Sequence, residues 1–167
     1  MTLRRRAHQG RGPALVAHID GGSRGNPGPA GYGVRIDDAA GGDPIELYGY
    51  LGIATNNIAE YAALLALLEH ARTLRPASLR IRSDSELLIR QMEGRYRVKN
   101  PHLRILHTAA SRMIVGIPGV KLEHVPREQN READALANRA MDEEGSSGSL
   151  PAAIRLLPGR PTQSRLV

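Results

Sequence analysis

Residues 18–33 read HIDGGSRGNPGPAGYG, and the interpretation of the whole chain depends on this stretch. The apolar residues 15–19 end at Asp20, which is followed directly by two glycines. A single Asp after a short strand is a common turn signal, because Asp and Gly both favour tight turns. Asp20 is therefore either a turn residue or a functional carboxylate, and the choice depends on whether other acids reach the same place.

The composition restricts the class of protein. A length of 167 residues favours one domain with a substantial hydrophobic core. The absence of Cys excludes disulfides, thiolate metal sites and cysteine nucleophiles. No apolar run approaches the roughly 20 residues of a membrane span, and residues 1–13 lack the apolar segment of a secretory signal. We therefore expect a cytoplasmic protein that does not bind a membrane.

The net charge of +6 comes from the two ends of the chain. Residues 1–13 hold four Arg and residues 145–167 hold three, and neither stretch has an acid. All 17 acidic residues lie between them, against 16 Lys and Arg, so the central part is close to neutral. We expect a basic, flexible extension over residues 1–13, a folded domain over 14–144, and a tail rich in Gly, Ser and Pro over 145–167, whose apolar residues 152–157 can dock on the domain. Nucleic-acid binding by the folded part must then come from local patches.

Hydrophobic periodicity predicts an α/β fold. Alternation and turn residues predict five strands, at residues 14–20, 31–38, 44–52, 78–84 and 119–125. Helical spacing and capping residues predict four helices, at residues 55–74, 85–94, 100–115 and 129–145. The order βββαβααβα gives an antiparallel meander followed by right-handed crossovers, which make the first, fourth and fifth strands parallel. The prediction is a mixed five-stranded sheet of order 3-2-1-4-5 with helices on both faces.

Four acids are candidates for one site at the carboxyl edge of this sheet, where ligands bind in such folds. Asp20 and Asp84 each end a predicted parallel strand, whereas Glu60 and Asp134 lie in the first turns of predicted helices. Each acid alone has an ordinary explanation, as a helix-surface acid or one favoured by the helix dipole. Four converging carboxylates would instead raise one another's pKa unless a cation held them.

The type of ligand indicates the type of cation. Ligation by oxygen alone suits Mg²⁺ or Mn²⁺ rather than zinc. Two such ions about 3.5–4 Å apart match the site used for in-line phosphoryl displacement. The sequence thus predicts that Asp20 is a metal ligand and that Gly21, with Gly22, lets a substrate backbone approach closely.

Four motifs, in this order, resemble the type 1 ribonuclease H (ribonuclease HI) family. They are DGGSRGNPGPAGYG (20–33), TNNIAEYAAL (55–64), SDSELL (83–88) and VPREQNREADALA (125–137). The resemblance spans residues 15–144 and implies the ribonuclease H-like fold, with residues 14–144 as the catalytic domain. It implies hydrolysis of the RNA strand of RNA–DNA hybrids to 5′-phosphate and 3′-hydroxyl ends. The implied cofactors are two Mg²⁺ ions, which Mn²⁺ can replace; we expect a monomer, with double-stranded RNA as an open second substrate.

The resemblance also assigns roles to single residues. Asp20 bridges both ions, and Asp134 completes the ion that activates the attacking water. Glu60 and Asp84 hold the ion at the leaving 3′-oxygen.

Contacts with the hybrid follow from the same resemblance. It places Asn26, Asn56 and Asn57 in the minor groove, where an A-like duplex exposes 2′-hydroxyls and base edges. It places Thr55 and Asn100 in a pocket for a phosphate of the DNA strand. The competing interpretation of these residues is helix capping or turn formation.

The chain departs from many family members in two places. The stretch MEGRYRVKNPHL (92–103) is shorter than the family's basic protrusion and has no Trp. The family often has a loop His that assists product departure, and here His124 and Arg127 compete for this role. KLEHV alternates like a strand, which puts His124 outside the loop, so we favour Arg127.

Two other functions compete with that of a nuclease. A non-catalytic module that binds hybrids or duplexes gains nothing from four carboxylates facing a polyanion. A transposase-like or integrase-like strand transferase fits the Gly-rich meander and the TNNIAEY helix poorly. The acidic quartet therefore favours a metal-dependent endoribonuclease.

Overall fold

The computed structural model of the chain describes residues 12–158. The strands are β1 (Ala14–Ser23), β2 (Gly28–Asp38), β3 (Ile45–Ala54), β4 (Ser78–Ser83) and β5 (Val120–His124). The helices are α2 (Asn56–Thr73), α3 (Glu86–Met92), α4 (Pro101–Val115), α5 (Arg131–Glu143) and α6 (Ala152–Arg155), with a 3₁₀ turn, η1, at Arg127–Gln129. All but two of the residues of the predicted N-terminal extension lie outside the described residues.

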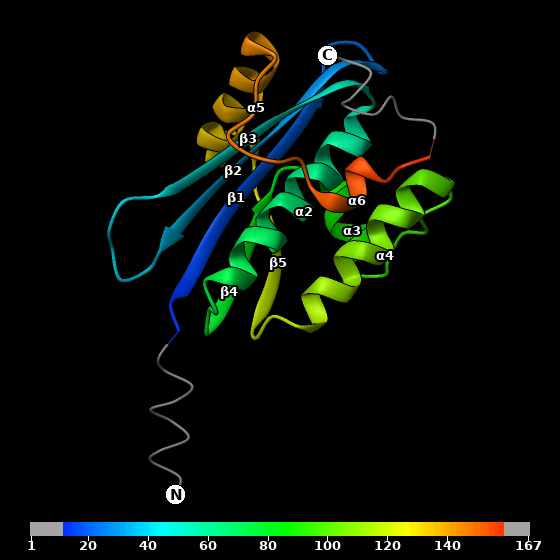
Figure 1. Ribbon diagram of the computed structural model, residues 1–167. Coiled ribbons are helices and arrows are strands. Elements are labelled where there is room, and N and C mark those ends of the chain that lie inside the picture. Colours follow the sequence, from blue (N-terminus) through cyan, green and yellow to red (C-terminus); the bar gives the residue numbers. More distant parts are fainter. Residues whose placement is uncertain (1–11, 159–167) are drawn as a thin grey trace, which may run out of the picture.

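The five strands form one mixed sheet of order β3-β2-β1-β4-β5. β2 pairs antiparallel with both β1 and β3, whereas β4 pairs parallel with both β1 and β5. Helix α2 packs on β1 and β2 with α4 beside it, and α5 packs on the opposite face (Figure 1). The predicted strand order and the helices on both faces are confirmed.

Helix α2 is the central helix of the core. Eleven of its 18 residues are buried, among them the run of Ala and Leu at residues 62–68, because the sheet covers one side and α4 another. Thr55 caps its N-terminus by accepting a hydrogen bond from the Ile58 N–H at 3.2 Å. This cap sets where the helix begins, so Glu60 falls in its first turns, close to the sheet.

Two glycines let a helix approach each face of the sheet closely. A Cβ on Gly21 would lie 2.2 Å from the Ala59 backbone of α2, and one on Gly33 would lie 2.2 Å from the Ala133 carbonyl of α5. The close approach that needs a glycine at position 21 is therefore that of the helix carrying Glu60. Gly21 also lines the open cleft, and its contact with substrate stays a prediction. A Cβ on Gly22 would meet nothing within 4 Å, so close approach does not require a glycine there.

The chain beyond residue 144 packs against the domain. Ser146 and Ser147 accept hydrogen bonds from the Tyr50 and Tyr48 N–H groups at 3.0 Å, which covers part of the β3 edge. The apolar residues that follow then join the main core, namely Leu150, Ile154 and Leu157. The predicted docking of residues 152–157 is observed, and the core extends past the predicted boundary at residue 144. Within residues 12–158, every helix is too short or too polar to span a membrane.

Candidate active site

Parallel pairing brings Asp20 and Asp84 side by side. β1 and β4 are in register as far as Ile19 opposite Ser83, so the next residues, Asp20 and Asp84, lie at the same level where β4 ends. The prediction that Asp20 also ends its strand is wrong, because β1 continues to Ser23 and Asp20 still pairs with Gly33 of β2. Glu60 approaches from α2, and its Oε1 accepts a hydrogen bond from the Gly21 N–H at 3.2 Å. Asp20, Glu60 and Asp84 each offer an oxygen, and these oxygens lie within 4.8 Å of one another. The predicted convergence of these three acids is observed.

Asp134 reaches the cluster from the opposite face of the sheet. It lies in the first turn of α5 and lines the same cleft as the other three acids, although it is outside the group of three whose oxygens lie within 4.8 Å of one another. The start of α5 is fixed to β1 by Asn130, which is fully buried and whose Nδ2 donates to the Ile19 carbonyl at 2.8 Å. This bond lies one residue before Asp20, so it sets the position of the helix relative to the site.

Burial makes the cluster unfavourable for negative charge. Burial, the charge of Asp84 and the hydrogen bond with Asp134 raise the pKa of Asp20 to about 8. Burial and the charges of Asp20 and Asp84 also raise the pKa of Glu60. The N–H of Gly21 opposes both shifts only in part. Without a cation, the cluster therefore retains protons near neutral pH.

The cluster fits a hard divalent cation. Among the described residues, the Oε2 atom of Glu60 is buried without a hydrogen-bond partner, which is costly for a carboxylate. A cation would provide that partner and would compensate the charge that burial disfavours. The donor set is oxygen only, which suits Mg²⁺ or Mn²⁺ and not a thiolate or imidazole metal.

The carboxylates face an open cleft of about 460 Å³. Its lining combines the four acids with amide and cationic side chains, among them Asn56, Asn57, Asn138, Arg24 and Arg127. Because acids and cations share this surface, it can accept a phosphate backbone beside bound metal ions.

The predicted substrate-contact residues divide into two groups. Gly21, Asn56 and Asn57 line the cleft. Asn26 does not line it, but its side chain accepts a hydrogen bond from the Asn56 N–H at 3.1 Å. Thr55 and Asn100 lie outside the cleft lining. Their side chains cap α2 and α4, as the competing interpretation proposed. The phosphate pocket stays a prediction.

Arg127 and His124 have different surroundings. Arg127 begins η1 and lines the cleft. His124 ends β5, as the alternation predicted, and its Nε2 lies 3.2 Å from the Asp84 carbonyl without lining the cleft. The structure thus places the Arg127 side chain in the cleft beside the carboxylates, and its role in product release stays a prediction.

Sequence reasoning missed three residues that support the site: Arg24, Asn130 and Asn138. The four-residue spacing of Asp134 and Asn138 on one helix face could have indicated their contact. No local pattern connects Arg24 or Asn130 to residues more than 100 positions away.

Comparisons with known proteins agree with this geometry. The family described as "Reverse transcriptase-like" matches residues 18–140. A ribonuclease HI of Halobacterium salinarum is 41% identical over 80% of this chain and 67% of its own length. A bifunctional protein of Mycobacterium tuberculosis is 42% identical over 83% of this chain but only 38% of its own length. The crystal structure of LC11-RNase H1 in complex with an RNA/DNA hybrid is 41% identical, with a TM-score of 0.73 over 78% of this chain and 98% of that one.

The motifs, the sheet order and these relatives lead to one assignment. Relatives at 41% identity are similar to this chain in sequence as well as in fold. The chain belongs to the type 1 ribonuclease H family.

Proposed function

We propose that this protein is an endoribonuclease that hydrolyses the RNA strand of RNA–DNA hybrids and leaves 5′-phosphate and 3′-hydroxyl ends. The observation that carries the proposal is the convergence of Asp20, Glu60, Asp84 and Asp134 on an open cleft. The relative solved with an RNA/DNA hybrid supports the choice of substrate. A module that only binds duplexes has no use for buried carboxylates that repel a phosphate backbone.

Two Mg²⁺ ions, replaceable by Mn²⁺, are the proposed cofactors. Glu60 and Asp84 would hold one ion and Asp134 the other, with Asp20 shared between them because it adjoins all three. When bound, such ions activate a water molecule and stabilise the leaving 3′-oxygen. The chain itself supplies a fixed set of oxygens, since β1, β4, α2 and α5 are packed in one core.

The amides at the edge of the cleft are proposed to read the shape of the duplex. The Asn57 side chain both donates and accepts hydrogen bonds, which matches the 2′-hydroxyls and base edges of a minor groove. The Asn56 Oδ1 accepts from the Ser23 N–H at 2.8 Å, so this residue also holds the β1–β2 loop beside α2. Arg127 is proposed to draw the cleaved 5′-phosphate away from the carboxylates.

The remaining proposals concern the setting of the reaction. We propose that one chain is sufficient for activity, because all four carboxylates come from it. A cytoplasmic location and cleavage of double-stranded RNA stay predictions.

A cleavage assay tests the proposed function. RNA–DNA hybrid, double-stranded RNA and double-stranded DNA, each end-labelled, are incubated with the protein in Mg²⁺, in Mn²⁺ and in chelator. We expect metal-dependent cleavage of the hybrid, intact DNA, and 3′-hydroxyl products that a polymerase can extend. Asp134→Asn should lose this cleavage, because it removes one proposed metal ligand. Its matched control is Asp43→Asn, which neutralises an exposed acid in the β2–β3 turn and should still cleave the hybrid. Binding of the hybrid without cleavage, or cleavage that persists in chelator, would overturn the proposal.

A further inference from the structure

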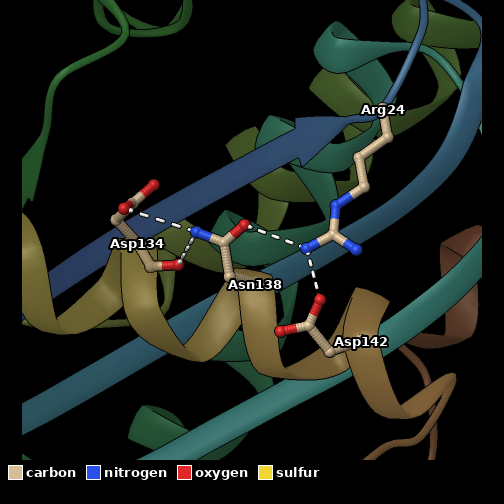
Figure 2. Close-up of polar contacts among 4 residues, drawn as sticks. All are labelled: Arg24, Asp134, Asn138 and Asp142. Carbon is tan, nitrogen blue, oxygen red and sulfur yellow. Dashed lines mark hydrogen bonds and ion pairs between the residues drawn. The ribbon is translucent and has the colours of Figure 1, made fainter.

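A chain of polar contacts runs from the β1–β2 loop to the Asp134 carboxylate (Figure 2). The Nη2 of Arg24 lies 2.6 Å from Oδ1 of Asp142 and donates to Oδ1 of Asn138 at 3.3 Å. The Nδ2 of Asn138 donates to the carbonyl of Asp134 at 3.1 Å and to its Oδ2 at 3.4 Å. These contacts connect Arg24, through Asn138, to Asp134, which is the acid of the site that lies on α5.

Asp134 needs such support more than Glu60 does. Glu60 is buried and receives a backbone hydrogen bond from Gly21, so the core fixes its carboxylate. Asp134 is only half-buried and lies on the surface of a helix, where packing alone does not select one rotamer of the side chain. Asn138 is four residues further along the same helix face and is the residue whose side chain holds the Asp134 carboxylate by one of its two oxygens.

Arg24 and Asp134 favour the same orientation of the Asn138 amide. A guanidinium only donates hydrogen bonds, so Arg24 faces the amide oxygen of Asn138. The carbonyl and the carboxylate of Asp134 only accept, so both face the amide NH₂. Without Arg24, the amide keeps its bonds to Asp134 but loses the partner that fixes its other end.

The exposure of these side chains argues against a role in stability. The Arg24 and Asp142 side chains are 47% and 64% exposed, and ion pairs this exposed contribute little to folding. Arg24 and Asn138 both line the cleft, so the contacts lie where orientation affects the site.

We propose that Asn138 is a positioning residue for Asp134, and that Arg24, held by Asp142, acts through Asn138. The inference rests on the proposed function, because Asp134 is a metal ligand only there. Asn138 and Arg24 would orient the Asp134 carboxylate before the metal binds. A supporting residue of this kind typically changes metal affinity by about 10-fold or more.

The direct test is a titration of the full chain with Mn²⁺ in the absence of substrate, in which electron paramagnetic resonance measures the bound Mn²⁺. Asn138→Ala keeps α5 intact, because Ala favours helices. The ion held by Asp134 has fewer carboxylate ligands than the other ion, so we expect its site to be the weaker one. The Mn²⁺ concentration at half-saturation of that site should rise about 10-fold. Hybrid affinity in chelator should stay within about 2-fold, and the Mg²⁺ concentration at half-maximal cleavage should rise in parallel with the Mn²⁺ result.

Arg24 requires a double-mutant cycle, because it also lines the cleft and could contact a phosphate directly. If it acts through Asn138, Arg24→Ala weakens Mn²⁺ binding, and Arg24→Ala/Asn138→Ala is no weaker than Asn138→Ala alone. Additive losses, or a fall in hybrid affinity in chelator on Arg24→Ala, would overturn this part and assign Arg24 to substrate binding.

Arg139→Ala is the matched control, since Arg139 forms a similarly exposed ion pair with Glu143 at 3.2 Å on the same helix. Arg139→Ala should leave Mn²⁺ binding unchanged. If it weakened Mn²⁺ binding as much as Asn138→Ala does, the loss in Asn138→Ala would be due to a less stable α5 and the proposal would be overturned. Unchanged Mn²⁺ binding in Asn138→Ala would overturn the proposal. Failure of the wild type to cleave hybrid would instead overturn the proposed function, and the Mn²⁺ titrations would still report on Asn138.

Discussion

Replacing Asp20 with Asn should stabilise the metal-free protein while abolishing its activity. The pKa of the buried Asp20 carboxyl is about 8, against 3.8 for an ordinary Asp. Between these values the folded state holds a proton that the unfolded chain has lost. The folded state thus binds more protons, and stability falls as pH rises through this window. Asn has nearly the same shape and no charge, so the variant avoids this loss.

The size of the effect follows from the same two values. Each pH unit across the window is equivalent to about 1.4 kcal/mol, which sets a ceiling on the order of 5 kcal/mol at pH 8. Relaxation and water entry reduce such penalties in real proteins, so we expect a gain of about 2–3 kcal/mol at pH 8 and about 1 kcal/mol at pH 5. For a domain of this size the gain at pH 8 corresponds to a rise in Tm of about 5–10 °C.

Thermal unfolding followed by circular dichroism, at pH 5 and pH 8 in chelator, measures this gain. Added Mg²⁺ should raise the Tm of the wild type, because the ion binds only the folded state, and should leave Asp20→Asn nearly unchanged. Hybrid cleavage by the variant should fall below a few per cent of wild type. Asp43→Asn removes the same charge at an exposed position and should change neither property. Equal Tm values for wild type and Asp20→Asn at pH 8 would refute the reasoning, as would substantial residual cleavage by the variant.

Three further predictions concern residues around the site. Arg127→Ala should lower the steady-state rate of hybrid cleavage severalfold with little change in metal affinity, because product release slows. His124→Ala should change this rate less than about 3-fold. A large rate loss with His124→Ala alone would assign product release to His124 instead. Deletion of residues 1–13 removes four Arg, so hybrid affinity and its dependence on salt, measured by titration at several salt concentrations, should both decrease. Ile154→Ala should cost about 2–5 kcal/mol in urea unfolding and leave kcat unchanged, because Ile154 is fully buried in the core and does not line the cleft. No loss of stability would contradict the observed docking.

The sequence predicted the sheet and the four acids that line the cleft because local patterns carry that information. Alternating apolar residues identify β1 and β4, and a parallel crossover between them places Asp20 beside Asp84 without further data. The position of Glu60 follows from the cap at Thr55, which sets the first turn of α2. Local periodicity is therefore sufficient to predict the place of a side chain when that place depends only on the strand or helix that carries it.

What escaped prediction depends on contacts between distant elements. The need for a glycine at position 21 is one example, because only the packing of α2 on β1 reveals that a Cβ there would meet the Ala59 backbone. The Asn130 bond to the Ile19 carbonyl joins residues 111 positions apart, and no pattern at either end indicates it. The inclusion of Leu150 in the core lies beyond the predicted domain boundary at residue 144, and it likewise depends on contacts with elements distant in the sequence.

The central claim is that the four carboxylates hold two metal ions, and anomalous scattering tests it most directly. Crystals of the protein with Mn²⁺ and a hybrid that resists cleavage would be measured at the manganese absorption edge. The account predicts two anomalous peaks about 4 Å apart, both in contact with Asp20, one flanked by Glu60 and Asp84 and the other by Asp134. A single peak, or peaks that do not share Asp20, would contradict it.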